Sequence, residues 1–311
     1  MPYLATPTTT PTTHATSRYT APAAPVAPVA PAAPATRVAA SASVLVREVV
    51  VGPVRPARVV AAGPSATYLD VGGRLLAVVA AGGVRLPCAA VLVGDTPPPV
   101  GSDLAVGSGS VHDAGRRLVD VSRWFDPRVR LAHLDPVAIE RLAAAVRARP
   151  CADALLPADA VERLADHLAA GDAHRAVVAA LVGRGSGLTP AGDDLVAGAL
   201  VAMRAAGSPA ADGFGAAVRD LAPAGTTRLS AALLAAADVG AVIPEAEAVL
   251  RALAAPGGAA VRAGRADRPD DLARATRHLL GVGHTSGWYL AAGLAVGAAH
   301  ALASTASGSI R

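Results

Sequence analysis

The segment from residue 183 to residue 194 has the residue types of an anion-binding loop at a helix start. Its sequence is Gly183-Arg184-Gly185-Ser186-Gly187-Leu188-Thr189-Pro190-Ala191-Gly192-Asp193-Asp194. Glycine lets a ligand approach the backbone closely, and the N–H groups at a helix start attract phosphate or carboxylate. We expect Thr189 to cap a helix that begins at Pro190. If the segment binds an anion, the predicted binding residues are Gly183, Arg184, Gly185, Ser186, Gly187 and Thr189. The alternative is that the segment is only a tight turn between two helices.

Two adjacent acids, Asp193 and Asp194, directly precede an apolar run. Unpaired carboxylates are costly to bury, so they must be paired, solvated or functional. Neighbouring helical side chains point about 100° apart, and the two cannot face one ligand equally. We expect one to take a proton or to bind Mg²⁺ or another divalent cation, while the other holds an Arg or a loop amide. Both are candidate catalytic and metal-binding residues, and the alternative is a pair of surface acids that favour the helix dipole.

Two later segments have the same design of hydroxyl residues before an apolar helix. In Gly283-His284-Thr285-Ser286-Gly287-Trp288, His284 is a candidate acid, base or ligand, and Thr285 and Ser286 are candidate binding residues. The segment Thr226-Thr227-Arg228-Leu229-Ser230 adds Thr227 and Arg228 as candidate substrate contacts. Ordinary helix capping would also explain both segments.

Missing residue types and broken motifs exclude several mechanisms. The chain contains no Lys, so Schiff-base chemistry and a Walker-type phosphate loop are excluded. The glycine spacing departs from the dinucleotide-binding fingerprint, and Ser186 does not stand in a Gly-x-Ser-x-Gly elbow. Backbone amides, Arg and carboxylates remain for the chemistry of the 183–194 segment.

Composition indicates a cytoplasmic protein with no nucleic-acid or membrane partner. Two cysteines, Cys88 and Cys151, lie in different segments without metal-ligand spacing, which fits a reducing compartment. The net charge is +4, but basic residues are scattered and aromatic residues make up only 3% of the chain, which leaves few stacking platforms. The longest apolar stretch, from Trp288 to Ala303, is rich in Ala and Gly and indicates a buried helix.

The periodicity predicts an α+β protein in which a β-rich, barrel-like domain precedes a larger Ala-rich helical domain. We expect a disordered Pro/Ala/Thr-rich arm at 1–40, the β-rich domain at 41–123, the helical domain at 124–305 and a tail at 306–311. Runs such as Val44-Leu45-Val46 and Val49-Val50-Val51 are interpreted as strands, and Asp70-Val71-Gly72-Gly73 as a hairpin connection. Helices are expected to begin with Asp135-Pro136 and to continue near 158–169, 172–182, 190–206, 229–238, 244–254, 269–280 and 287–303.

The segments GRGSGLTPAGDDLVAGAL, TTRLSAALL and GHTSGWYLAAGL, in this order, resemble the AllH family, a subunit of oxamate carbamoyltransferase. The resemblance covers roughly residues 40–305 as a domain order. It implies a part in converting oxalurate and phosphate into oxamate and carbamoyl phosphate during allantoin and purine nitrogen breakdown, with other carbamoyltransferase subunits as partners. Ala191 stands where the family motif has Ser, so no hydroxyl role is transferred to that position.

The sequence therefore supports a carbamoyltransferase subunit that binds a small anionic substrate. In this hypothesis the glycine segment binds phosphate or carbamoyl phosphate, Asp193 or Asp194 places a cation or orients Arg184, and His284 with Ser286 completes the site. Two alternatives remain: a non-catalytic anion-binding or scaffold subunit, and a cation-dependent hydrolase that uses the Asp pair.

Overall fold

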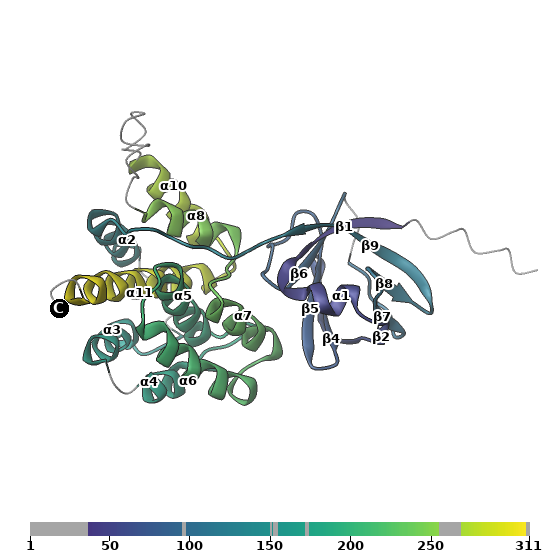
Figure 1. Cartoon of the computed structure of the whole chain (residues 1–311), viewed down its shortest axis with the longest axis horizontal. Coiled ribbons are helices and arrows are strands. Elements are labelled where there is room, and N and C mark those ends of the chain that lie inside the picture. The colour runs from purple at the N-terminus through teal and green to yellow at the C-terminus, as the bar shows by residue number, and fades with distance from the viewer. Residues whose placement is uncertain are drawn as a thin grey trace, which may run out of the picture. The chain divides into compact units, whose positions relative to one another are not determined.

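The computed structural model describes residues 37–94, 98–149, 151, 155–171, 174–254 and 269–308. Strands fill the first part of this range and helices the second (Figure 1). The predicted α+β class is therefore confirmed. The Pro-rich arm lies outside the described residues up to position 36, but its predicted end at 40 is wrong, because residues 38–40 already belong to the first strand. The predicted tail also begins too early, since the last helix continues to Gly308.

Nine strands form one nearly closed, barrel-like sheet. They are β1 Val38–Ser43, β2 Arg55–Pro56, β3 Arg58–Ala62, β4 Ala66–Val71, β5 Arg74–Val79, β6 Ala89–Leu92, β7 Leu104–Gly107, β8 Ser110–Asp113 and β9 Arg116–Phe125. The order is β2-β7-β8-β9-β1-β6-β5-β4-β3, in which β1–β9 and β5–β6 pair in parallel. Only Ala57 separates the two outermost strands along the chain, and its N–H donates to the carbonyl of Leu104. Strand β9 ends at Phe125, two residues after the predicted domain boundary.

The connection between β4 and β5 is the hairpin that the sequence predicts. Val71 pairs with Arg74, and the two intervening glycines have φ values of 60° and 86°. Positive φ at both central residues is typical of the turn whose twist matches the strands that it joins. Apolar residues of this hairpin, among them Leu69 and Leu76, are fully buried in the barrel core.

The valine-rich segment after β1 is helical, so its prediction as strands was wrong. It forms a 3₁₀ turn, η1 Val44–Val46, followed by α1 Arg47–Val51. The side chain of Ser43 caps the turn by accepting from the N–H of Leu45 at 3.1 Å. The buried residues are Val46, Val49 and Val50, whose three- and four-residue spacing follows one helical face. Burial and capping thus outweigh the β preference of valine.

The helical part continues to the end of the described chain. Its helices are α2 Pro136–Ala148, α3 Ala160–Ala170, α4 His174–Leu181, α5 Ala191–Ala205, α6 Ala210–Gly225, α7 Arg228–Asp238, α8 Pro244–Ala252, α10 Pro269–Leu280 and α11 Ser286–Gly308. Asp135 caps α2 as predicted, because its carboxylate accepts from the N–H of Val137 at 2.9 Å. Helix α6 is absent from the sequence-based prediction. It contains Pro223, and its buried face includes Phe214 and Val218.

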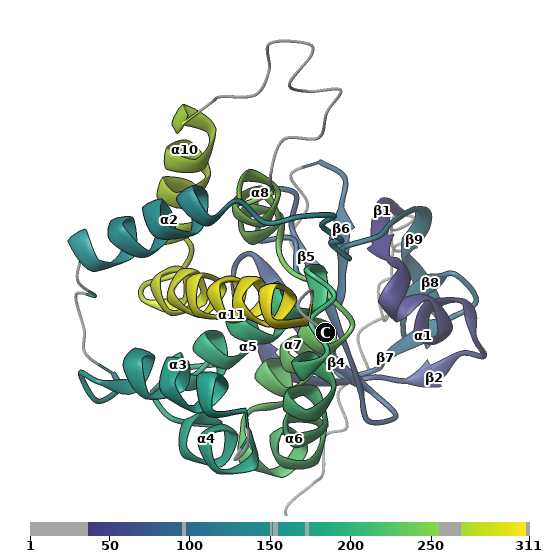
Figure 2. The same ribbon diagram turned by 60° about the vertical axis from the view of Figure 1, so that its left-hand side comes forward.

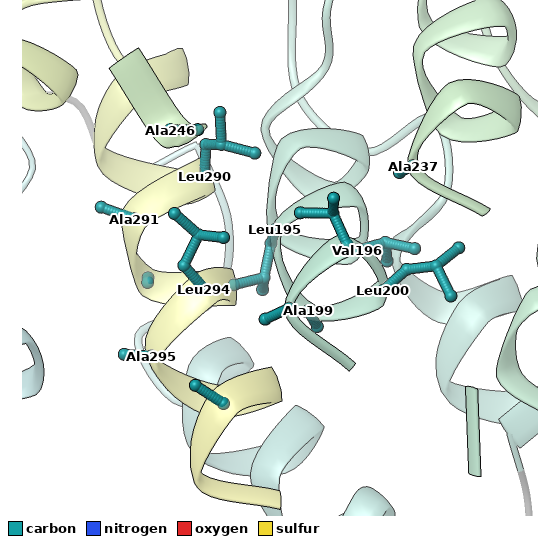
Figure 3. Packing of buried hydrophobic residues seen from close by; sticks show 14 of the residues in the cluster. Leu195, Val196, Ala199, Leu200, Ala237, Ala246, Leu290, Ala291, Leu294 and Ala295 are labelled. Atoms are coloured by element: carbon teal, nitrogen blue, oxygen red, sulfur yellow. The ribbon is translucent and has the colours of Figure 1, made fainter. Parts of the chain in front are cut away.

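Helices α5 and α11 pack backbone against backbone (Figure 2). A Cβ on Gly198 would lie 2.3 Å from the carbonyl oxygen of Leu290, and one on Gly293 would lie 2.1 Å from that of Leu195. At the helix starts Thr189 contacts Ser286, and further along a Cβ on Gly297 would lie 2.2 Å from the carbonyl oxygen of Ala199. The two helices therefore run parallel, and their N-terminal ends lie at the same end of the pair. Figure 3 shows Leu195 and Leu294 in the core between them. Within the described residues, no helix combines the length and apolarity of a membrane span.

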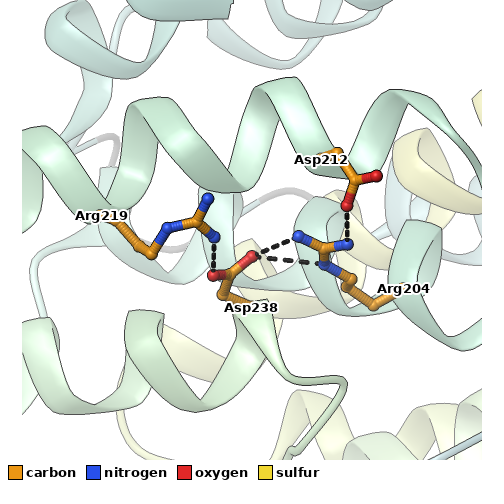
Figure 4. A network of polar contacts seen from close by, with 4 residues as sticks. All are labelled: Arg204, Asp212, Arg219 and Asp238. Carbon is orange, nitrogen blue, oxygen red and sulfur yellow. Dashed lines mark hydrogen bonds and ion pairs between the residues drawn. The ribbon is translucent and has the colours of Figure 1, made fainter.

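An ion-pair network fastens α5 to α6 and α7 (Figure 4). The Asp238 carboxylate on α7 accepts from Nη2 of Arg204 on α5 at 2.7 Å and also pairs with Arg219 on α6. Arg204 donates further to Asp212 on α6. Since the Asp238 side chain is only 7% exposed, both arginines are needed to offset its desolvation. The network holds the C-terminal end of α7, where Asp238 is the last helical residue, against α5 and α6.

Candidate functional site

The glycine loop between α4 and α5 has positive φ at each of its three alternating glycines. Gly183, Gly185 and Gly187 have φ values of 76°, 109° and 92°, a region that other residues rarely adopt. A Cβ on Gly183 would lie 2.1 Å from the carbonyl oxygen of Gly225, so the loop runs directly against the end of α6. The residues from Arg184 to Leu188 are exposed, and no ion pair of Arg184 occurs within the described part of the chain. The loop thus presents a cation and several amides to solvent.

Asp193 is a structural anchor for this loop. The residue is 1% exposed, and its Oδ1 accepts from the backbone N–H of Gly183 at 2.7 Å. Its Oδ2 accepts from the hydroxyl of Thr226, which precedes α7. Both oxygens are therefore occupied within the protein. This is the loop amide contact that we expected for one acid of the pair, and the sequence had no signal for Thr226 as the second partner.

Asp194 has a different environment. It is 8% exposed, and its Oδ2 is buried without a hydrogen-bond partner among the described residues. Burial raises the pKa of this carboxyl to about 8, and the charge of Asp193 acts in the same direction. Hydrogen bonds from Ser286 and Thr189 act against this rise. Asp194 is consequently a carboxyl group that is largely protonated at neutral pH and has one oxygen available.

The hydroxyls of Thr189 and Ser286 join the starts of α5 and α11. Their oxygens lie 2.9 Å apart, although the two residues are 97 positions apart in the sequence. The prediction of Thr189 as an N-cap is wrong: α5 begins at Ala191, its N-cap is Pro190, and no side chain caps it. The hydroxyl faces Ser286 and Asp194 instead. Two of the predicted segments thus meet in one cluster of Thr189, Asp194 and Ser286.

The third segment meets the loop through its threonines. Thr227 caps α7 by accepting from the N–H of Ser230 at 3.0 Å, and its hydroxyl donates to the carbonyl of Leu188. Arg228, a predicted substrate contact, forms an ion pair of 2.7 Å with Asp70 of β4, and its side chain is 54% exposed. The capping alternative therefore describes Thr227 well.

The remaining candidates lie around the start of α11. His284 is exposed in the turn before the helix. Thr285 is buried, and its carbonyl accepts from the N–H groups of Trp288 and Tyr289. Ser286 is the first residue of α11 and is half-buried. Of the hydroxyl residues in this turn, Ser286 is the one that lowers the pKa of Asp194.

The acids do not form a typical divalent-cation site. No group of three or more His, Cys, Asp or Glu side chains suited to a metal ion occurs in the part of the chain that the structure describes. Mg²⁺ requires about six oxygen ligands in near-octahedral geometry. Asp193 already uses both oxygens, and Asp194 is accompanied by hydroxyls. The donor set therefore suits an oxygen-rich anion better than a cation.

The parallel packing of α5 and α11 gives the cluster its electrostatic character. Each helix N-terminus has a partial positive charge, and the two lie together beside the cluster. Arg184 adds a full positive charge on the exposed side of the loop. Neutral hydroxyls, a protonated carboxyl and helix N-termini together form a hydrogen-bonding site for an anion.

The fold and the cluster define an α+β protein with a polar site at the joined starts of two buried helices. Residues 181–298 match the family model described as oxamate carbamoyltransferase subunit AllH. This range contains all three segments that meet at the site, and the barrel lies outside it. Comparisons with curated proteins and with solved structures found no match.

Proposed function

We propose that this chain is a subunit of an oxamate carbamoyltransferase and binds phosphate or carbamoyl phosphate where α5 and α11 begin. The main observation is the Asp194 oxygen that is buried without a hydrogen-bond partner among the described residues. A buried polar atom of this kind costs free energy unless something completes its hydrogen bonding. A ligand oxygen is the simplest partner. The AllH match over the same residues supports this assignment.

Each group around the cluster has a role in holding such a ligand. The protonated carboxyl of Asp194 donates its O–H to a ligand oxygen, as the Thr189 and Ser286 hydroxyls also can. The Gly183 amide is used by Asp193 and the Arg184 amide by the carbonyl of Leu181. The amides of residues 185–187 and the side chains of Arg184 and Ser186 contact the exposed side of the anion. Thr285 supports the start of α11, and the exposed His284 lies in the turn before this helix. Phosphate oxygens suit this set, since they accept several hydrogen bonds at once.

The reaction is the conversion of oxalurate and phosphate into oxamate and carbamoyl phosphate, within allantoin and purine nitrogen breakdown. Both substrates are anions, and the transfer requires phosphate to be held in line with a polarised carbonyl. Other carbamoyltransferase subunits complete the enzyme. We place it in the cytoplasm, which the sequence composition favours.

Calorimetric titration of the full chain with phosphate and with carbamoyl phosphate tests the binding site. Arg184→Ala should weaken binding about tenfold or more, since it removes a charge-assisted hydrogen bond. Arg175→Ala is the matched control, because that exposed arginine pairs with Asp220. If wild-type protein with its copurified subunits binds neither ligand, the proposal is refuted.

The pH dependence of binding tests the role of Asp194. Ionisation of its carboxyl places a negative charge beside the anion, so wild-type affinity should fall relative to Asp194→Asn as the pH rises through about 8. Phosphate itself ionises identically in both titrations, so the ratio of the two affinities isolates the carboxyl. A ratio that is constant from pH 6 to 9 would contradict this role.

Turnover with the partner subunits separates a catalytic subunit from a scaffold. Asp193→Ala loosens the loop from α7, because the carboxylate bonds both Gly183 and Thr226. Loss of turnover with retained assembly supports the catalytic proposal. Loss of assembly by a variant that still binds phosphate would instead indicate a scaffold.

A further inference from the structure

The cluster has the arrangement of an activated nucleophile. The hydroxyl oxygens of Ser286 and Thr189 lie 2.9 Å apart, and these are the two side chains that act to lower the pKa of Asp194. A serine becomes nucleophilic when a base within hydrogen-bond reach can take its proton and a third group orients the pair. The Thr189 hydroxyl is the third group beside Ser286, and Asp193 holds the first turn of α5, which carries Asp194, through its bonds to Gly183 and Thr226.

We propose that Ser286 is a catalytic nucleophile that accepts the carbamoyl group, with Asp194 as its general base. This inference rests on the proposed function. The proposed function requires only that the site holds the two substrates next to each other. The further inference adds a covalent intermediate between the carbamoyl group and the protein.

The first half of the reaction balances as follows. The reactive form is the minor fraction of the protein in which Asp194 is ionised at neutral pH. In this form the Asp194 carboxylate takes the proton of Ser286, and Ser286 Oγ forms a bond to the terminal ureido carbon of oxalurate. The bond from that carbon to the inner nitrogen breaks, and Asp194 returns the proton to that nitrogen. Oxamate leaves, and a carbamoyl ester remains on Ser286.

In the second half, a phosphate oxygen attacks the carbonyl carbon of the carbamoyl ester. The bond from this carbon to Ser286 Oγ breaks and carbamoyl phosphate leaves. The attacking hydrogen phosphate gives up its proton to Asp194, which passes it to Ser286 Oγ. Negative charge on the carbonyl oxygen in both halves lies near two helix N-termini, which stabilise it. No oxidant, reductant or metal ion takes part in either half.

The position of Asp194 suits both directions of proton transfer. An exposed aspartate is too weak a base to accept a serine proton efficiently, and too acidic to exist as a donor at neutral pH. Burial and the neighbouring charge of Asp193 raise the pKa of Asp194, which makes its carboxylate a stronger base and keeps its acid form present at neutral pH. The oxygen of Asp194 that lacks a hydrogen-bond partner among the described residues is available to the leaving nitrogen.

The direct test is peptide mass spectrometry of the full chain, copurified with its subunits and quenched in acid after incubation with carbamoyl phosphate alone. We expect a carbamoyl group on Ser286. Because the chain contains no Lys, the usual side-chain target of nonspecific carbamoylation is missing from it. Ser304→Ala is the matched control, since Ser304 is half-buried on the same helix and bonds the carbonyl of His300.

Two variants distinguish this inference from the proposed function. Asp194→Asn keeps a neutral side chain at the site, so it should bind phosphate at pH 7 yet lose the Ser286 adduct and at least a hundredfold of turnover. Ser286→Ala should also lose the adduct and turnover while keeping measurable phosphate binding. If wild-type protein binds and transfers but Ser286→Ala transfers equally well, the nucleophile is refuted and the binding site stands.

Isotope exchange measures the intermediate without isolating it. With a covalent intermediate, the enzyme exchanges labelled oxamate into oxalurate in the absence of phosphate. Ser304→Ala should do so at the wild-type rate, and Ser286→Ala should not. Exchange that strictly requires phosphate would overturn the covalent step, because it indicates direct transfer between the two substrates.

Discussion

Replacing Asp194 with Asn removes a buried titrating group and keeps its shape. In the folded protein this carboxyl has a pKa of about 8, whereas an unfolded chain has an aspartate pKa of about 4. The folded state therefore holds a proton between these two pH values that the unfolded state has lost. The stability linked to this proton is complete below about pH 4, and it is lost as the pH rises towards about 8.

The size of the effect follows from proton linkage. One proton corresponds to about 1.4 kcal/mol in the free energy of unfolding for each pH unit. Between pH 5 and pH 7 wild-type protein should thus lose about 3 kcal/mol relative to Asp194→Asn. Above pH 8 the difference in unfolding free energy between the two proteins should become constant, because Asp194 is then ionised in both the folded and the unfolded wild-type protein.

Urea unfolding followed by far-ultraviolet circular dichroism, at each pH unit from 5 to 9, measures this difference. Asp193→Asn is an informative companion, since the charge of Asp193 contributes to the raised pKa of Asp194. In Asp193→Asn the unfolding free energy should stop falling at a lower pH than it does in the wild-type protein. If the wild-type and Asp194→Asn curves run parallel from pH 5 to 8, the buried-acid argument is refuted, and with it the base assigned to Ser286.

Two further predictions concern the framework around the site. Gly293→Ala should destabilise the protein by about 1 to 3 kcal/mol in thermal unfolding, because its Cβ would lie 2.1 Å from a carbonyl oxygen of α5. Gly281→Ala meets its nearest atom at 3.4 Å and should change little; equal effects would argue against the close helix contact. Asp238→Asn should cost about 2 to 3 kcal/mol in urea unfolding, since it weakens buried contacts with two arginines. Asp212→Asn, at an 83% exposed side chain, should cost less than about 1 kcal/mol, and the reverse order would refute this account of the network.

Features set by neighbouring residues were predictable from the sequence. The paired glycines at 72 and 73 specify a hairpin through their own φ preferences, and Asp135 caps α2 through a bond to a residue two positions away. Both signals are local. The valines from 44 to 51 were predicted incorrectly because β-branching is an average preference, whereas burial of one face decided the outcome. Helix α6 was not predicted because Pro223 and the glycines within it are unfavourable for helix formation, whereas burial of its apolar face stabilises the helix in the folded protein.

The candidate site was only partly predictable for a similar reason. Its three segments are visible as polar helix starts, but which side chains meet depends on how helices are rotated and paired. Asp193 and Asp194 are identical in type and adjacent in sequence, yet one bonds Gly183 and Thr226 and the other keeps an oxygen without a hydrogen-bond partner among the described residues. The contact of Thr189 with Ser286 likewise depends on the parallel pairing of α5 and α11.

That parallel pairing has a consequence for the order in which the molecule becomes functional. Helix α11 follows α5 by about eighty residues, so a ribosome releases α5, α6, α7 and α8 before α11 exists. During that time the glycine loop has its own acids but lacks the serine. Long-range contacts of this kind form late in folding. The cluster is therefore completed only after α11 has been synthesised, and a chain that ends before α11 lacks the serine to which we assign the nucleophilic role.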